Sequence, residues 1–379
     1  MRAPVRLLVV FSGLLIAGML VLRFAVLPHV DARLNTLHGP VSQPVAANVQ
    51  AFHANTFVAD MHADSLLWGR DLERRHQRGH VDLPRLRAGG VDLQVFSAVT
   101  SVPRGLNYNR NSSDSDSLPL LFIASWRQPS TWFSPKQRAL AQAAELVRLA
   151  ESAAIKLVLR RGDLSAEGLK ALLALEGMHA LNGRAQALDE LHEAGYRMMG
   201  LTHFFDNEVA GSAHGVEQYG LTDFGRSLLP RMEELGITLD LAHASPAAFA
   251  DTLRFAKQPV VVSHGGVRGT CPGPRNLSDD QLRALARNGG LVGIGYWDGA
   301  VCDASIAGIV RALLYAIRIA GIDHVGLGSD FDGTISAPFD TSGLPRLTAA
   351  LLDAGLPQAD VAKVLGGNLR RVLAGNLPQ

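Results

Sequence analysis

The chain has only two cysteines among 379 residues, and neither charge sign is in excess, with 36 Lys and Arg against 35 Asp and Glu. So few cysteines exclude a disulfide-rich scaffold and a zinc module built from clustered thiolates. A formal net charge of +1 lacks the basic excess that nucleic-acid binding needs, so we expect no nucleic-acid partner. A composition of 47% hydrophobic and 19% charged residues is globular and excludes collagen-like, disordered and multi-span membrane proteins.

The N-terminus carries an apolar run. Arg2 and Arg6 precede an uncharged stretch at residues 7–22, and apolar residues continue after Arg23 to residue 27. The uncharged part is shorter than the roughly 20 residues of a spanning helix, but snorkelling of Arg23 would let residues 7–27 cross a membrane. Residues 1–27 are therefore interpreted as a retained anchor, with a cleavable signal segment as the alternative, because no small-x-small site or lipid-bearing cysteine follows. The leading positive charges predict that the N-terminus lies in the cytoplasm and that the remaining chain lies on the other side of the membrane.

The remaining chain alternates between strand-like and helix-like patterns. Residues 28–51, with scattered Pro, Gly and Asn, are interpreted as a linker. Strand-like runs occur at residues 56–62, 91–97, 172–176, 197–203, 237–243, 259–264, 291–296 and 324–330, and amphipathic helical patterns at residues 136–151, 185–193, 223–235, 278–287, 305–320 and 358–373. Eight such units predict that residues 52–379 form one α/β domain, a (β/α)8 TIM-type barrel.

An open doubly wound sheet is the alternative fold. Such a sheet usually carries a glycine-rich phosphate turn after its first strand, and no G-x-G-x-x-G or P-loop sequence follows a strand-like run here. Residues 100–134, rich in Ser, Asn, Asp and Trp, fit no strand-helix unit and predict an insertion over the barrel mouth.

Most of the predicted strands end on a polar side chain. In a barrel these ends open onto one face, so distant residues reach a single pocket. Imidazole and carboxylate donors without thiolates suit a hydrolytic zinc-type site. Five candidate ligands exceed the needs of one tetrahedral ion and predict two ions bridged by one carboxylate. The residues delivered to the pocket are His62, Asp64, Glu176, His203, His243, His264 and Asp330, with Glu176 as the candidate bridge.

Each of these residues also has an ordinary structural interpretation. A His-x-Asp pair can be a solvated strand end, Glu176 can cap a helix, and His203 or His243 can be a core histidine. Their shared position at strand ends favours a metal site, because buried histidines and carboxylates are costly unless paired or metal-bound. The other histidines are interpreted as surface or loop residues, among them His179, His192, His214 and His324.

Seven short motifs are informative in combination. They are Asp60-Met61-His62-Ala63-Asp64, Leu175-Glu176-Gly177, Leu201-Thr202-His203, Asp240-Leu241-Ala242-His243, Ser263-His264, Arg275-Asn276 and Gly328-Ser329-Asp330-Phe331-Asp332-Gly333. In order, spacing and strand context they resemble the renal or membrane dipeptidases, the M19 metallopeptidases. The resemblance extends from about Thr56 to Leu373.

The resemblance implies a cofactor of two Zn²⁺ per chain. By similarity, His62 and Asp64 would bind one zinc ion, His243 and His264 the second, and Glu176 both. A hydroxide bridging the metals would then attack the amide of a dipeptide.

The resemblance also implies roles for three further residues. His203 would contact the substrate carbonyl and stabilise the oxyanion, and Asp330 would carry protons from the bridging water to the departing amine. Arg275 would bind the free carboxylate of the dipeptide, a task that suits a planar guanidinium. Cys271 and Cys302 fit a cysteine pair of mammalian members and would form a disulfide in an oxidising compartment.

The expected protein is thus a dipeptidase anchored to a membrane and facing the periplasm or the outside. Arg outnumbers Lys 31 to 5 and no C-terminal hydrophobic tail is evident, which favours a bacterial envelope protein. Family members tolerate a D-residue at the second position, which would suit cell-wall fragments. They often form dimers, so a homodimer is the partner state that the resemblance implies.

Two other functions are considered. A barrel amidohydrolase or deaminase acting on cyclic amides or bases would usually open with His-x-His and bridge its metals through a carboxylated lysine. This chain has His-x-Asp, and none of its five lysines ends a predicted strand. A catalytically inactive, membrane-displayed metal-binding protein would lack the proton-transfer residue, but Asp330 is present.

Overall fold

The computed structural model describes residues 12–14, 16–39, 44–152 and 154–379. Within this part of the chain, eight parallel strands follow one another around a closed barrel, and β10 pairs with β2 to complete the ring. The strands are β2 (Ala59–Ala63), β3 (Leu93–Val99), β5 (Lys170–Glu176), β6 (Tyr196–Gly200), β7 (Thr238–Asp240), β8 (Val261–Gly265), β9 (Leu291–Ile294) and β10 (Val325–Leu327). Each strand overlaps one predicted run, and the TIM-type barrel is confirmed.

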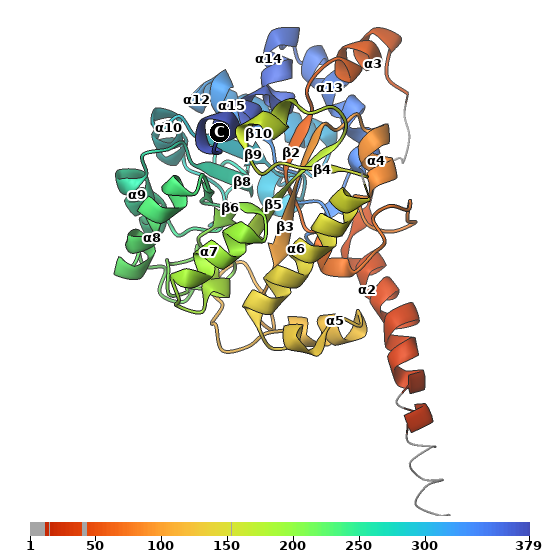
Figure 1. The fold of residues 1–379 in the computed structure, drawn as a ribbon. Coiled ribbons are helices and arrows are strands. Elements are labelled where there is room, and N and C mark those ends of the chain that lie inside the picture. The colour runs from red at the N-terminus through yellow and green to blue at the C-terminus, as the bar shows by residue number, and fades with distance from the viewer. Residues whose placement is uncertain (1–11, 15, 40–43, 153) are drawn as a thin grey trace, which may run out of the picture.

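Helices surround the barrel on its outer side (Figure 1). The longer ones are α6 (Pro135–Glu151), α7 (Gln186–Glu193), α8 (Asp223–Glu234), α9 (Pro246–Phe255), α10 (Asp279–Arg287), α12 (Ile306–Ala320), α13 (Leu344–Asp353) and α15 (Asn368–Asn376). Shorter helices are α4 (Leu83–Ala88), α5 (Leu118–Ala124), α11 (Asp298–Val301) and α14 (Gln358–Ala362). The helix starts follow the sequence signals, since Ser278 and Gln281 form a capping box at α10 and Ser245 caps α9 ahead of Pro246.

The alternation of side chains along a strand determines which face of the strand a site residue occupies. On β5, Leu172 and Ala174 belong to an apolar cluster that also contains residues of α15. Asn376 of α15 donates a hydrogen bond of 3.2 Å to Thr238 at the start of β7, so α15 covers the amino ends of the strands. Glu176 shares the face of Leu172 and Ala174 and is the last residue of β5, so it lies at the opposite, C-terminal end.

The segment before the barrel packs against it. Asn35 lies between a helix and a short strand, and its side chain accepts a hydrogen bond from the backbone of Thr334, in the loop after β10. The elements of this segment fall largely in the predicted linker at residues 28–51. They are the π-helical turn η1 (Leu22–Val26), α2 (Leu27–Leu34), β1 (Thr36–Leu37), which pairs with β11 (Ser336–Ala337), and α3 (Ala47–Ala54).

Among the described residues, one helix, Ser12–Leu34, is long and apolar enough to cross a membrane, by length and composition. It leaves the barrel beside α5 and projects away from it (Figure 1). Arg2, Arg6 and the first part of the uncharged stretch at residues 7–22 lie outside the described residues.

Candidate active site

The predicted site residues meet at the C-terminal end of the barrel. His62 and His264 lie on β2 and β8, and Glu176 ends β5. Asp64 directly follows β2, while His203, His243 and Asp330 each lie three residues beyond β6, β7 and β10. All seven side chains are buried. The barrel therefore brings together residues that are up to 268 positions apart in the sequence.

The Glu176 carboxylate is the centre of the cluster. Its Oε1 lies 3.0 Å from Nε2 of His243 and 3.5 Å from Nε2 of His264. Nε2 of His62 lies 3.6 Å from the same oxygen, and Nε2 of His203 lies 3.5 Å from Oε2. One carboxylate thus faces four imidazoles, as a bridging ligand would.

The aspartates complete the arrangement around His62. Nε2 of His62 lies 3.3 Å from Oδ1 of Asp64 and 3.9 Å from Oδ1 of Asp330. Three overlapping groups of donor atoms are close enough to hold a metal ion. They are His62, Asp64 and Glu176; Glu176, His203 and His243; and His62, His264 and Asp330.

Burial changes the charge state of this cluster. It raises the pKa of Glu176 and of Asp64 well above their usual range, and the pKa of Asp330 to about 7. Burial also lowers the pKa of His243 and His264 well below the ordinary histidine value, which leaves these imidazoles neutral and able to act as ligands. Three buried carboxylates beside neutral imidazoles favour the binding of cations, which would restore the ionised state.

Unpartnered polar atoms indicate the same fit to metal ions. Nε2 of His62, Oδ1 of Asp64 and Oε2 of Glu176 are buried without a hydrogen-bond partner. Such atoms are costly in a protein interior unless a ligand satisfies them. Nitrogen and oxygen donors of this kind match the ligand preferences of Zn²⁺.

The backbone is strained at two site residues. His243 and Asp330 both adopt a left-handed conformation with φ of 62°, which non-glycine residues rarely do. Gly177, directly after Glu176, has φ of 89°, and an added Cβ would lie 2.5 Å from Nδ1 of His179. Strain of this type concentrates at functional sites, where surrounding contacts hold it in place.

A buried ion pair supports the loop that carries Asp330. Asp332 binds Arg70, accepts a hydrogen bond of 2.6 Å from Ser65 Oγ and one of 2.7 Å from the backbone N–H of His80. Burial alone would raise the pKa of Asp332, but Arg70 and these hydrogen bonds outweigh burial and hold that pKa well below the usual value. Asp332 is therefore an ionised anchor for its loop.

Arg275 faces the pocket from the loop after β8. Its Nη1 is buried without a hydrogen-bond partner, and the guanidinium lies 5.5 Å from the centre of the Trp297 ring. The pocket that it shares with Glu176 and Asp330 has a volume of about 200 Å³. This is below the range of drug-sized sites, so the pocket suits a small molecule with an anionic group.

Four aromatic side chains line the pocket or pack directly behind it. Tyr108, from the predicted insertion, accepts a hydrogen bond of 2.8 Å from Nε1 of Trp297. Phe204 and His214 stack at 4.7 Å, and His214 lies 5.5 Å from the ring of His243. Sequence reasoning did not assign a role to Tyr108, Trp297 or His214. Their only signal is a position in long connections after strands, where barrel enzymes carry their site residues.

Two of the histidines that were expected at the surface or in loops are not at the surface. His179 and His214 are buried, not surface residues, with side chains held by Thr100 Oγ1 at 2.8 Å and by the Tyr108 carbonyl at 2.8 Å. Burial lowers the pKa of each to about 4. Their burial has a physical reason, because both lie in loops that fold back over the barrel end.

The two cysteines flank the Arg275 loop. Cys271 and Cys302 form a disulfide. The side chain of Asn276 donates hydrogen bonds to the carbonyls of Cys271, at 2.8 Å, and of Ala300, at 3.1 Å. The segment beside Arg275 is thus tied to α11.

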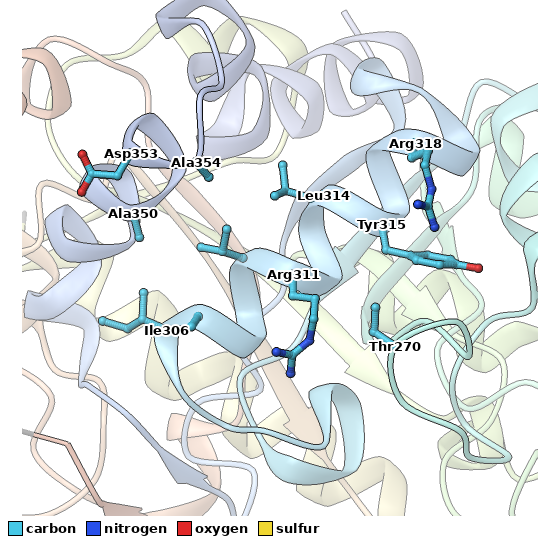
Figure 2. A pocket seen from close by; sticks show the side chains of 11 residues that line it. Thr270, Ile306, Arg311, Leu314, Tyr315, Arg318, Ala350, Asp353 and Ala354 are labelled. Carbon is cyan, nitrogen blue, oxygen red and sulfur yellow. The ribbon is translucent and has the colours of Figure 1, made fainter.

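A second hollow lies outside the barrel on α12 (Figure 2). It is an open groove of about 890 Å³ whose lining contains one carboxylate, Asp353, and no histidine. It therefore offers no group of metal ligands. Its labelled lining residues are Thr270, Ile306, Arg311, Leu314, Tyr315, Arg318, Ala350, Asp353 and Ala354.

A (β/α)8 barrel with a buried cluster of imidazoles and carboxylates at its C-terminal end is the architecture of a barrel metallohydrolase. Residues 46–376 match the family described as membrane dipeptidase, peptidase family M19. Dipeptidase aclJ of Aspergillus oryzae is 31% identical over 342 residues, which cover 83% of this chain and 77% of that protein. The chain belongs to the M19 family and is a metallodipeptidase, so the resemblance seen in the sequence is confirmed.

Solved structures agree with this assignment. The dipeptidase AC, a metallopeptidase of family M19, has a TM-score of 0.70 at 27% identity and covers 86% of this chain and 99% of its own. A metallopeptidase from Rhodobacter sphaeroides has a TM-score of 0.70 at 26% identity and covers 85% and 100%. That structure contains a phosphinate mimic of the dipeptide L-Ala-D-Ala.

Proposed function

We propose that this chain is a dizinc dipeptidase that accepts dipeptides with a C-terminal D-residue. The observation that carries the proposal is the Glu176 carboxylate, which faces four imidazole nitrogens within 3.6 Å beside the unpartnered Nη1 of Arg275. The bound mimic of L-Ala-D-Ala in the related metallopeptidase supports this substrate class.

The proposed ligands divide into two sets that share Glu176. His62 and Asp64 would hold one zinc ion, and His243 and His264 the other. The short distances between His62 and Asp64, 3.3 Å, and between Nε2 of His243 and of His264, 3.2 Å, support this pairing. When bound, the two ions supply an activated water and polarise the peptide carbonyl.

Arg275 and Asp330 have separate tasks in the proposed reaction. Arg275 binds the carboxylate of the dipeptide, which satisfies its free Nη1 and fixes the length of the substrate. Asp330 moves protons from the attacking water to the departing amine. A pKa of about 7 supports this role, because a group that titrates near the working pH both accepts and donates protons readily.

His203 is proposed to stabilise the oxyanion. Its Nδ1 lies 3.2 Å from the Ser101 carbonyl, which can only accept a hydrogen bond, so Nδ1 carries a proton. Nε2 can then donate to the substrate oxygen only when the ring is doubly protonated. Burial lowers the pKa of His203 well below its usual value, so the negative charge that develops on the substrate must favour that second proton.

The location follows from the N-terminal segment. We propose that residues 1–27 are a membrane anchor, residues 28–51 a linker and residues 52–379 the catalytic domain, with residues 100–134 as an insertion. The Ser12–Leu34 helix supports an anchor, and the disulfide of Cys271 and Cys302 suits an oxidising space outside the cytoplasm. A bacterial periplasm or outer surface is the proposed site of action, and a homodimer is proposed from family resemblance alone.

The test uses the full chain purified in detergent with L-Ala-D-Ala and with L-Ala-D-Ala amide, which lacks the free carboxylate. We expect hydrolysis of the dipeptide, loss of activity with a chelator, recovery with Zn²⁺, and little cleavage of the amide. Arg275→Lys should lower kcat/KM for the dipeptide about 10- to 100-fold, since a charge-assisted hydrogen bond contributes about 1.5–3 kcal/mol.

The matched control is Arg268→Lys. Arg268 lies on the same loop but binds the Asn276 carbonyl at 2.8 Å, so this change should leave kcat/KM nearly unaltered. Equal cleavage of the dipeptide and its amide, or activity that resists the chelator, would contradict the proposal.

A further inference from the structure

Three large apolar side chains are exposed on α5 and on the connection that follows it. Leu120 on α5 is 74% exposed, Phe133 is 78% exposed and Trp126 is 48% exposed. Single exposed apolar residues are common on soluble proteins, but three such residues within the segment 120–133 form a concentration that needs a partner. We call Leu120, Trp126 and Phe133 the α5 patch.

Trp126 has an unusual backbone conformation. This residue has φ of 58°, a conformation that a bulky side chain rarely adopts. Behind the patch, Leu118 and Phe122 are buried in an apolar cluster with Leu27 of α2. The inner face of α5 is therefore fixed to the barrel and to the N-terminal helix, while the outer face stays uncovered.

The α5 patch is continuous with the membrane-length helix. The ring of Trp126 lies 5.4 Å from the ring of Phe24, which is itself 66% exposed. A groove of about 400 Å³ separates the two elements and is lined almost entirely by apolar side chains. The groove residues are Ile16, Met19, Leu20, Ile123, Trp126, Arg127 and Trp132.

The length of the helix gives the depth of the patch. The sequence has 16 uncharged residues at positions 7–22, fewer than the roughly 20 that a helix needs to cross the hydrocarbon core. The missing length must come from residues after Arg23, where Phe24 contacts Trp126. The α5 patch therefore lies at the level of the outer boundary of the bilayer, where Trp residues gather.

The hydrogen bond of Arg23 is consistent with this depth of the helix in the bilayer. Its Nη2 donates a hydrogen bond of 3.1 Å to the carbonyl of Gly69, on the connection after β2. The charge that interrupts the apolar run is thus satisfied by the catalytic domain and need not reach for water. The connection after β2 therefore lies beside the N-terminal helix at the level of Arg23.

We propose that the α5 patch is a second membrane contact, which inserts into the outer boundary of the lipid bilayer beside the N-terminal helix. The proposal rests on the proposed membrane anchorage. It implies that the barrel does not swing freely on its anchor. Because α5 follows β3, the catalytic end of the barrel is the end held near the membrane surface.

The test places a tryptophan in the patch and reads its depth. The full-length variants Phe133→Trp and Phe255→Trp are reconstituted into phosphatidylcholine vesicles with or without phosphatidylcholine brominated near the headgroup end of its acyl chains. Phe255 is 40% exposed and is the last residue of α9, a helix that lies away from α5 in Figure 1. Both variants should retain dipeptidase activity, since both positions are exposed.

The emission added by Phe133→Trp should fall about twofold in the brominated vesicles, and the emission added by Phe255→Trp should not change. Vesicle flotation of the same samples separates the two claims. Protein that floats while the Trp at position 133 is unquenched would overturn the α5 contact and leave the anchor intact. Protein that does not float would overturn both.

Discussion

Asp330 combines three properties that rarely coincide in one carboxylate. It is buried, its backbone is left-handed with φ of 62°, and its pKa is raised to about 7. Burial also raises the pKa of Glu176 well above its usual range, but four imidazoles surround its carboxylate. We therefore propose that Glu176 binds the metal ions and that Asp330 transfers protons.

Replacing Asp330 by Asn tests that division. The amide keeps the shape but cannot exchange a proton, so kcat should fall about 10²- to 10⁴-fold while KM and metal content stay close to those of the parent. Asp298→Asn, at the exposed rim of the same pocket, is the control and should change kcat little. Steady-state kinetics with elemental analysis measures both, and an Asp330→Asn enzyme of full activity would remove the role.

Among the elements, the N-terminal segment has an unexpected link to the site. Asp31 of α2 binds Nε of Arg78 at 2.8 Å, and Arg70 lies between Asp31 and Asp332. Asn35 accepts a hydrogen bond of 2.9 Å from the backbone of Thr334, which has φ of 62°. The segment before the barrel therefore supports the loop that carries Asp330.

Asn35→Ala tests whether the N-terminal segment supports the loop that carries Asp330. Removing the acceptor leaves the Thr334 N–H unpaired, which costs about 1–3 kcal/mol of unfolding free energy. We also expect a drop in kcat larger than the change in KM, because the loop that positions Asp330 is loosened. Asn55→Ala is the matched control, since the Asn55 side chain donates a hydrogen bond to the Ala51 carbonyl at the exposed end of α3, away from the Asp330 loop. Chemical denaturation and steady-state kinetics measure these effects. Equal effects of Asn35→Ala and Asn55→Ala would contradict the support of the Asp330 loop by Asn35.

The strands and their polar ends could be predicted from sequence because both depend on local patterns. Apolar runs of strand length mark the eight strands of the barrel, and the barrel topology alone brings Glu176 next to His243 and His264. Residues in loops could not be predicted in this way. His214 and Tyr108 approach the site through connections whose path is fixed by tertiary contacts, such as the 2.8 Å hydrogen bond between them.

At the scale of the whole molecule, buried neutral histidines couple stability to pH. Burial lowers the pKa of His179 from 6.5 to about 4, so the folded protein binds fewer protons than the unfolded chain between these values. The stabilising contribution is present above pH 6.5 and is lost as the pH falls through that window. Between pH 7 and pH 5 the loss for this residue is about 2 kcal/mol of unfolding free energy.

His179→Gln measures the pH-dependent contribution of His179 to the free energy of unfolding. Gln cannot titrate, and its amide can still bind the Thr100 hydroxyl that His179 contacts at 2.8 Å. Denaturant unfolding at the two pH values should show a smaller stability loss in the variant than in the parent, by about 2 kcal/mol. Identical losses would mean that His179 is not neutral in the folded protein.

The fold of the whole molecule combines these features. A barrel brings seven buried donors to one end, a disulfide and a buried ion pair hold the loops around them, and an apolar helix leaves the fold at the same end as α5. The proposed reaction depends on two cations that share Glu176.

The most direct test is the metal content of the freshly purified full-length enzyme by elemental analysis. We expect two zinc ions per chain, and fewer than one in Glu176→Ala, because that change removes a ligand from both positions. A single ion per chain, or an unchanged content in Glu176→Ala, would contradict a shared two-metal centre.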